Sequence, residues 1–195
     1  MTPVTPKPQR FRTFEPAVVA FGSNLGDREA TVRAAIDDLA ATPGVRVDAV
    51  SPYLETAALR LDGVDEDAPR YLNGVVLIST ALDPHALLDE LNRIEDAHGR
   101  VRTERWGDRT LDLDLIAMGG RHIADDRLVL PHPRAAEREF VLAPWLAVDP
   151  DAELPGAGRV DALLARLRDG HGGEATGGAS DTATTGTADH EGGAS

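Results

Sequence analysis

The stretch GRVRTERWGDRTLDLDL, residues 99–115, ends in a strict alternation of leucine and aspartate. A repeat of two residues is typical of a β-strand, in which residues i and i+2 project from the same face. Asp112 and Asp114 should therefore point one way and their leucine neighbours the other. The pattern predicts a strand with one buried face and one face that carries two adjacent carboxylates.

Arginines are concentrated just ahead of this carboxylate pair, at Arg100, Arg102, Arg105 and Arg109. Two neighbouring carboxylates repel each other unless a cation neutralises them. Mg²⁺ suits such a pair because it binds one or two carboxylates together with substrate phosphates, and the arginine fork matches phosphate oxygens. The segment therefore predicts a site for a metal and a polyphosphate. The alternative is a set of solvated ion pairs on an exposed sheet face, each of which contributes little stability.

The composition limits the classes of protein to which the chain can belong. Its 195 residues are 42% hydrophobic, which supports one domain with a buried core, and the absence of cysteine excludes disulfides and thiolate metal sites. A net charge of -13 argues against nucleic acid or an anionic membrane as the main partner. We expect a cytoplasmic monomer that binds small molecules and neither nucleic acid nor a membrane.

Changes in composition divide the chain into three parts. Residues 1–16 are basic and proline-rich and should form a flexible N-terminal lead-in. Residues 170–195 are Gly, Ala, Thr, Ser and acid, without Leu, Ile, Val or an aromatic residue, so burial cannot offset the entropy of ordering them. We expect a disordered acidic tail there, and a folded domain over residues 17–169.

Apolar periodicity and end signals predict the elements of the folded part. In chain order they are strand 17–21, helix 28–41, strand 45–54, polar loop 59–70, strand 71–80, a helix between the cap Asp83 and Gly99, strand 111–115, hairpin 121–130, and helices 135–147 and 160–167. The order βαβ-βαβ predicts an α+β fold of ferredoxin-like, split βαβ topology, with an antiparallel sheet and two helices on one face. The C-terminal helices should cover the other face and complete α-β-α layers.

An ordered series of short motifs adds a family resemblance over Val18–Asp149. The motifs are FGSNLGDR (21–28), YLN (71–73), RWGDRTLDLDL (105–115), LPHPR (130–134) and EREFVL (137–142). This series resembles the 6-hydroxymethyl-7,8-dihydropterin pyrophosphokinases of folate biosynthesis. The resemblance implies transfer of pyrophosphate from ATP, the co-substrate, to the pterin hydroxyl with release of AMP, and it implies two Mg²⁺ ions.

The resemblance also implies roles for individual residues. Catalytic roles fall to Arg100, Arg109, Asp112 and Asp114, and the two aspartates would hold the metal. ATP would be bound by Asn92, Glu95, Arg102, Arg105, Trp106, Leu115, Arg127, His132 and Arg138. The pterin would be bound by Thr56, Ala57, Leu59, Tyr71, Asn73, Trp106 and Phe140.

The sequence departs from the family pattern in two places. The segment VRTERWG is one residue shorter than is usual in the family, and Ala57 stands where a proline often follows the threonine. Two other functions would use some of the same residues. One is a non-catalytic module that binds pterin or nucleotide, and the other is a Mg²⁺-dependent phosphohydrolase.

Overall fold

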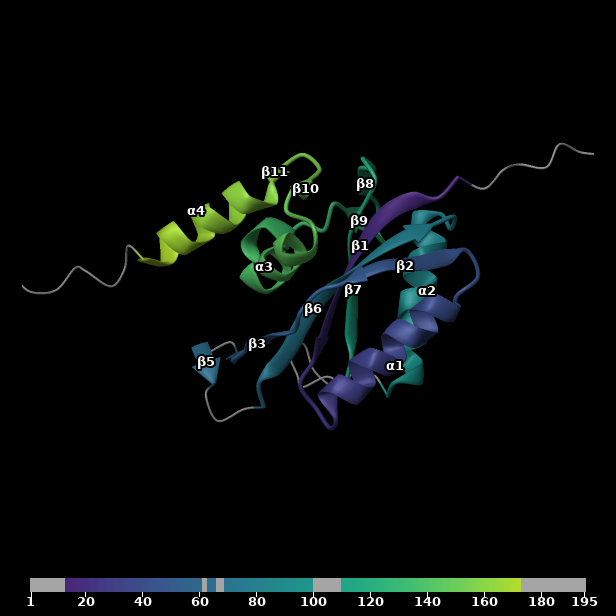
Figure 1. Ribbon diagram of the computed structural model, residues 1–195, viewed down its shortest axis with the longest axis horizontal. Helices are drawn as coiled ribbons and strands as arrows, with labels where there is room; N and C mark the ends of the chain where they lie inside the picture. Colours follow the sequence, from purple (N-terminus) through teal and green to yellow (C-terminus); the bar gives the residue numbers. More distant parts are fainter. Residues whose placement is uncertain (1–12, 61–62, 66–68, 100–109, 173–195) are drawn as a thin grey trace, which may run out of the picture.

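An antiparallel sheet forms the centre of the computed structural model, which describes residues 13–60, 63–65, 69–99 and 110–172 (Figure 1). The sheet has five strands in the order β2-β6-β1-β7, and β3 also pairs with β6. Every pairing is antiparallel. The strands are β1 (Glu15–Ser23), β2 (Val45–Val50), β3 (Leu54–Thr56), β6 (Tyr71–Thr80) and β7 (Asp112–Met118).

Two helices, α1 (Arg28–Ala41) and α2 (Pro84–Ala97), cover one face of this sheet (Figure 1). The Asp27 side chain caps α1 by accepting from Ala30 N, as Asp83 caps α2. Gly99, just past the end of α2, has a φ of 80°, which favours glycine. These local signals explain why the predicted limits of both helices are confirmed.

The opposite face is covered by α3 (Glu139–Val148) and α4 (Val160–Gly172) (Figure 1). Their apolar side chains pack on the sheet residues that point away from α1 and α2, and this second core includes Ala20, Ile116, Val141, Trp145 and Leu163. Mixed α and β structure with helices on both faces is therefore confirmed. The short turn η1 (Ala135–Glu137) leads into α3.

Three small hairpins lie outside the main sheet. They pair β4 (Ala58–Arg60) with β5 (Gly63–Asp65), β8 (Ile123–Ala124) with β9 (Val129–Leu130), and β10 (Glu153–Leu154) with β11 (Gly158–Arg159). The hairpin expected at 121–130 is confirmed. The prediction of a loop at 59–70 is wrong in part, because part of that segment forms β5 and the end of β4.

The strand expected at 45–54 is interrupted after Val50. Ser51 N donates to Val75 O at 3.0 Å, and Val75 N donates to Ser51 Oγ at 2.9 Å. The serine hydroxyl thus takes the place of a main-chain carbonyl in the ladder, and the chain leaves the sheet at Pro52 before β3 begins.

The remaining differences concern the ends of elements. The helix expected at 135–147 is divided at Arg138, whose extended backbone (φ -111°, ψ 96°) separates η1 from α3. α4 continues to Gly172, beyond both the expected end at 167 and the domain limit at 169. β1 begins at Glu15, where Arg121 donates to the carboxylate at 2.7 and 2.8 Å.

Candidate active site

The alternation in β7 separates its side chains as the sequence predicts. Leu111, Leu113 and Leu115 are buried in the core beneath α1 and α2. Asp112 and Asp114 are half-buried and lie on the other face of the strand. The register of β7 against β1 shifts next to Ile116, so Ile116 and Ala117 both pack in the core beneath α3 and α4.

One row of the sheet joins an amide to a carboxylate across a glycine. Gly22 on β1 pairs with Asn73 on β6 on one side and with Asp112 on β7 on the other. Residues directly opposite each other on antiparallel strands project from the same face, and strands lie about 4.8 Å apart. The row therefore spans about 10 Å. A Cβ at Gly22 would lie 3.1 Å from Asn73 Oδ1, so the glycine leaves space between the two side chains.

Three predicted pterin-side residues gather at the Asn73 end of this row. The Asn73 side chain is buried, and its Nδ2 donates to Thr56 Oγ1 at 2.8 Å. Thr56 on β3 pairs with Tyr71 on β6, two residues before Asn73, so all three share one face. Ala57 is half-buried directly after β3, whereas the structure describes only the backbone of Leu59.

Arg138 connects the carboxylate end of the row to α3. Its Nη1 donates to Asp114 Oδ2 at 2.8 Å, and its guanidinium lies 5.6 Å from the centre of the Phe140 ring. The pair is partly buried, with the side chains 19% and 35% exposed, so solvent screens it less than a surface ion pair. The break between η1 and α3 thus supplies both a cation and an aromatic ring to the site.

His132 lies close to the same carboxylates. Burial lowers the pKa of His132, and the charge of Asp114 opposes that effect. Its Nδ1 accepts from Arg134 N at 3.2 Å, so in the neutral ring the proton is on Nε2. Burial thus favours the neutral form of His132, which offers one N–H donor, a group suited to a phosphate oxygen.

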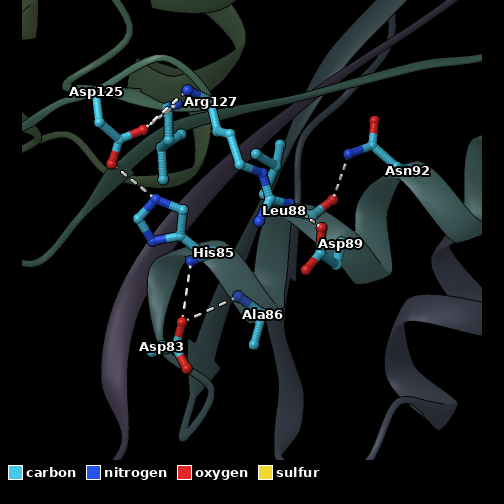
Figure 2. A network of polar contacts seen from close by, with 9 residues as sticks. Asp83, His85, Ala86, Leu88, Asp89, Asn92, Asp125 and Arg127 are labelled. Carbon is cyan, nitrogen blue, oxygen red and sulfur yellow. Dashed lines mark hydrogen bonds and ion pairs between the residues drawn. The ribbon is translucent and has the colours of Figure 1, made fainter.

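Side chains of α2 hold the β8–β9 hairpin (Figure 2). His85 Nε2 contacts Asp125 Oδ2 at 2.8 Å, and Arg127 Nη2 donates to Asp89 Oδ1. Asn92 lies three residues after Asp89 on α2, so the two side chains are neighbours on one face of that helix (Figure 2). The structure thus brings Asn92 and Arg127, two predicted ATP-side residues, to one surface.

Two other predicted ATP-side residues face the core. Glu95 on α2 is 1% exposed, and its Oε1 accepts from Leu113 N at 2.7 Å. Leu115 is 4% exposed within the core beneath α1 and α2. Both side chains lie on the opposite side of the sheet from Asp112 and Asp114. The main role that the structure gives Glu95 is to bind the backbone of β7.

Several predicted residues lie outside the described part of the chain: Arg100, Arg102, Arg105, Trp106 and Arg109. Sequence reasoning also missed residues that the structure brings to the site. Gly22 stands in the sequence only within the motif FGSNLGDR, and no sequence motif points to Asp89 or His85 as site residues. The spacing of four between His85 and Asp89, which places both on one helix face, was the available signal.

The carboxylates of the site suit a metal ion whose other ligands are substrate phosphates. Among residues 13–60, 63–65, 69–99 and 110–172, no group of three or more His, Cys, Asp or Glu side chains could hold a metal ion. Asp112 and Asp114 provide two carboxylates, and Mg²⁺ is commonly held by one or two carboxylates together with substrate phosphates. Carboxylates beside guanidinium groups therefore favour the class of metal-assisted phosphoryl-type transferases.

Comparison with known proteins identifies the family. The family model described as 7,8-dihydro-6-hydroxymethylpterin-pyrophosphokinase (HPPK) matches residues 18–150. A 2-amino-4-hydroxy-6-hydroxymethyldihydropteridine pyrophosphokinase of Methylorubrum extorquens is 44% identical over 77% of this chain and 92% of its own length. A Mycobacterium leprae protein of the same name is 45% identical over 77% of this chain and 82% of its own. The chain belongs to the HPPK family and is an ATP-dependent diphosphotransferase.

Solved structures support the fold. A Plasmodium falciparum HPPK-DHPS crystal structure with pteroate has a TM-score of 0.63 and 12% identity. The match covers 83% of this chain and 44% of the solved chain, so this chain spans less than half of that protein. Within the part of our chain that the structure describes, no helix is long and apolar enough to cross a membrane.

Proposed function

We propose that this chain transfers the pyrophosphoryl group of ATP to the hydroxymethyl oxygen of 6-hydroxymethyl-7,8-dihydropterin and releases AMP. The row of Asn73, Gly22 and Asp112 is the observation on which the proposal rests. It offers an amide to recognise a ring edge at one end and a carboxylate to hold a cation at the other. A substrate that carries its hydroxyl at the end opposite its polar ring edge would fill that row.

On this proposal the pterin lies over Gly22. The Asn73 amide both donates and accepts, as the pterin edge requires, and Thr56 fixes the orientation of that amide. Tyr71 and Phe140 supply aromatic surfaces for the ring. Ala57 is assigned to the same substrate, and Leu59 and Trp106 are assigned to it by the family resemblance alone.

The phosphates lie over the carboxylate end of the row. Asp112 and Asp114 would hold two Mg²⁺ ions, which when bound supply Lewis-acid neutralisation of the phosphate charge. His132 donates its Nε2–H to a phosphate oxygen. Arg138, which already neutralises Asp114, lies close enough to share its donors with the phosphates.

The remaining nucleotide contacts come from α2, the β8–β9 hairpin and the arginine segment. Asn92 and Arg127 bind from the surface that they share, and Arg100, Arg102, Arg105 and Arg109 neutralise the charge that develops during transfer. Glu95 and Leu115 support the site from beneath the sheet through the backbone of β7.

In the proposed reaction the pterin hydroxyl oxygen bonds to the β-phosphorus of ATP, and the bond between that phosphorus and the oxygen bridging to the α-phosphate breaks. AMP leaves with that oxygen, and the proton of the hydroxyl is released to water. The protein contributes alignment of the two reactants and neutralisation of charge, which are the main components of such transfers.

The finer architecture also belongs to this proposal. We assign the core to the ferredoxin-like, split βαβ class. Along the chain its main elements follow one another as β1, α1, β2, β6, α2 and β7, and across the sheet the strands lie in the order β7-β1-β6-β2. We keep the catalytic domain at about residues 17–169, between a lead-in and a tail, although β1 begins at Glu15 and α4 continues to Gly172. The chain acts as a monomer, which sedimentation velocity can test.

An assay of products tests the function. The chain is supplied with ATP, Mg²⁺ and 6-hydroxymethyl-7,8-dihydropterin, and the nucleotide products are separated. We expect AMP to form only with the pterin present and in equal amount with pterin pyrophosphate. Phosphate release without the pterin would indicate a phosphohydrolase, and binding without turnover would indicate a non-catalytic module.

A further inference from the structure

Four charged or titratable side chains join α2 to the β8–β9 hairpin, and we name them the hairpin latch (Figure 2). The latch consists of His85 and Asp89 on α2 and of Asp125 and Arg127 on the hairpin. His85 and Asp89 are four residues apart and so lie on one helix face. Each element contributes one carboxylate and one nitrogen-bearing side chain: Asp125 of the hairpin contacts His85 of α2, and Arg127 of the hairpin contacts Asp89 of α2.

The main chain of Arg127 is fixed within the latch. Asp125 Oδ1 accepts from Arg127 N and Leu128 N, both at 2.9 Å, and Asp125 N donates to Leu128 O at 3.1 Å. Asp125 Oδ2 meets His85 on the first turn of α2. The backbone of Arg127 is therefore held close to α2. Its long side chain can still change its ion-pair partner.

The far end of that side chain is exchangeable. Arg127 is 57% exposed and Asp89 is 59% exposed, so water screens their attraction and the pair contributes little stability. A polyphosphate carries several negative charges and accepts a guanidinium fork more strongly than one exposed carboxylate. Arg127 can therefore leave Asp89 for such a ligand at small cost.

Asp89 lies beside Asn92, so its negative charge is close to the proposed nucleotide contacts. Asn92 lies three residues further along α2, and its Nδ2 donates to Leu88 O at 2.9 Å (Figure 2). On the proposed function, both Asn92 and Arg127 contact the nucleotide. Asp89 thus places a negative charge on the surface that would receive a polyanion. The carboxylate competes with the nucleotide for the Arg127 guanidinium.

We infer that Asp89 limits the affinity of the chain for nucleotide by acting as the competing counter-ion of Arg127. The inference rests on the proposed function and adds to it a residue that sets nucleotide affinity. Asp89 acts through Arg127 and stays away from the reacting atoms, so it should change the KM for ATP and leave kcat unchanged.

Binding of a nonhydrolysable ATP analogue with Mg²⁺ to the full chain, measured by calorimetry at low salt, tests the inference. We expect Asp89→Asn to lower Kd by about two- to five-fold, the range that follows from an exposed ion pair. Glu90→Gln is the matched control, since Glu90 is the next residue on α2 and pairs with Arg93 at 2.8 Å. It should leave Kd unchanged.

Asp89→Asn in an Arg127→Gln variant separates competition for Arg127 from a general effect of removing a negative charge. In Arg127→Gln, the further change Asp89→Asn should not alter Kd, because the competition has been removed. The inference is wrong if Asp89→Asn leaves Kd unchanged or raises it, or if the gain persists without Arg127. A wild-type chain that binds no analogue would instead contradict the proposed function itself.

Discussion

The carboxylate of Glu95 holds the strand at the point midway between the two aspartates. Its Oε1 accepts from Leu113 N at 2.7 Å, and Leu113 lies between Asp112 and Asp114 in β7. Among the residues that the structure describes, β7 is the edge strand of the sheet on this side, and no strand there pairs with this N–H. A buried side chain from α2 thus stands in for the missing strand and fixes the backbone that carries both carboxylates.

Removal of that acceptor should destabilise the protein. Glu95→Ala leaves the N–H of Leu113 buried without this acceptor, which costs about 1–3 kcal/mol in the free energy of unfolding. Glu95→Gln keeps a side-chain oxygen and should lose much less. Urea unfolding of the two variants measures the difference, and equal stability of Glu95→Ala and wild type would refute the role.

Loss of either β7 aspartate should remove activity without unfolding the chain. Asp112→Asn and Asp114→Asn are expected to lower kcat by at least about 100-fold, because the proposed cation site loses a fixed charge. Circular dichroism and the midpoint of thermal unfolding should show that the fold is kept. Asp151→Asn is the control, since Asp151 is 92% exposed and remote from β7 along the chain. Near-normal turnover in either β7 variant would rule out the metal assignment.

The hydroxyl of Thr56 should matter to one substrate only. Thr56→Val removes the acceptor for Asn73 Nδ2 and keeps the shape, so the KM for the pterin should rise about five- to tenfold, the value of one hydrogen bond. The KM for ATP should stay the same. Thr56→Ser keeps the hydroxyl and serves as the control. A rise in both KM values would point to a general loss of structure.

Gly74 is required by the ring of Phe21. A Cβ at Gly74 would lie 2.2 Å from Phe21 Cζ, so Gly74→Ala should cost about 1–3 kcal/mol through overpacking. Phe21→Leu shortens the side chain and should recover part of that loss in the double variant. The control is Gly120→Ala, because nothing lies within 4 Å of a Cβ at that position.

A double-mutant cycle on unfolding free energies measures the coupling between positions 21 and 74. We expect an interaction of about 1 kcal/mol or more, as is found for residues in contact. Strict additivity of the two changes would show that the ring and the glycine do not share this space.

Acid should weaken the contribution of Asp125. The pKa of the Asp125 carboxyl lies below its ordinary value because the N–H groups of Arg127 and Leu128 donate to it, and the contact with His85 adds to this effect. A carboxyl whose pKa is lower in the folded state stabilises the fold above its unfolded pKa of about 3.9. That stability is lost as the pH falls through the folded pKa.

Unfolding of wild type and Asp125→Asn in urea at pH 5, 4 and 3 checks this dependence. The advantage of wild type should be largest at pH 5 and should shrink at each lower pH. An advantage that stays constant between pH 5 and pH 3 would show that the charge of Asp125 does not stabilise the hairpin.

Elements with local signals could be predicted from the sequence. The limits of α1 and α2 follow from capping aspartates, a first-turn proline and a terminal glycine, all of which act within a few residues. The end of β2 could not be predicted in this way. It depends on Ser51 meeting Val75, which is distant along the chain.

The same distinction applies to the site. Alternation alone placed Asp112 and Asp114 on one face, because the period of a strand is a local property. The contact between Arg127 and Asp89, 38 residues apart, depends on how the hairpin packs against α2. The buried position of Glu95 likewise depends on tertiary packing, because its partner Leu113 lies 18 residues away in β7.

Gly22 lies between Asn73 and Asp112 in one row of the sheet, and the sheet fixes the distance between these two residues. Asn73 and Asp112 are set apart by two strand spacings, about 10 Å, and that interval is fixed by main-chain hydrogen bonds that no side-chain motion alters. On the proposed function, selectivity for substrate length would follow from this fixed interval. A pterin whose hydroxyl is carried on a longer arm would overshoot the cation whenever its ring edge is correctly docked.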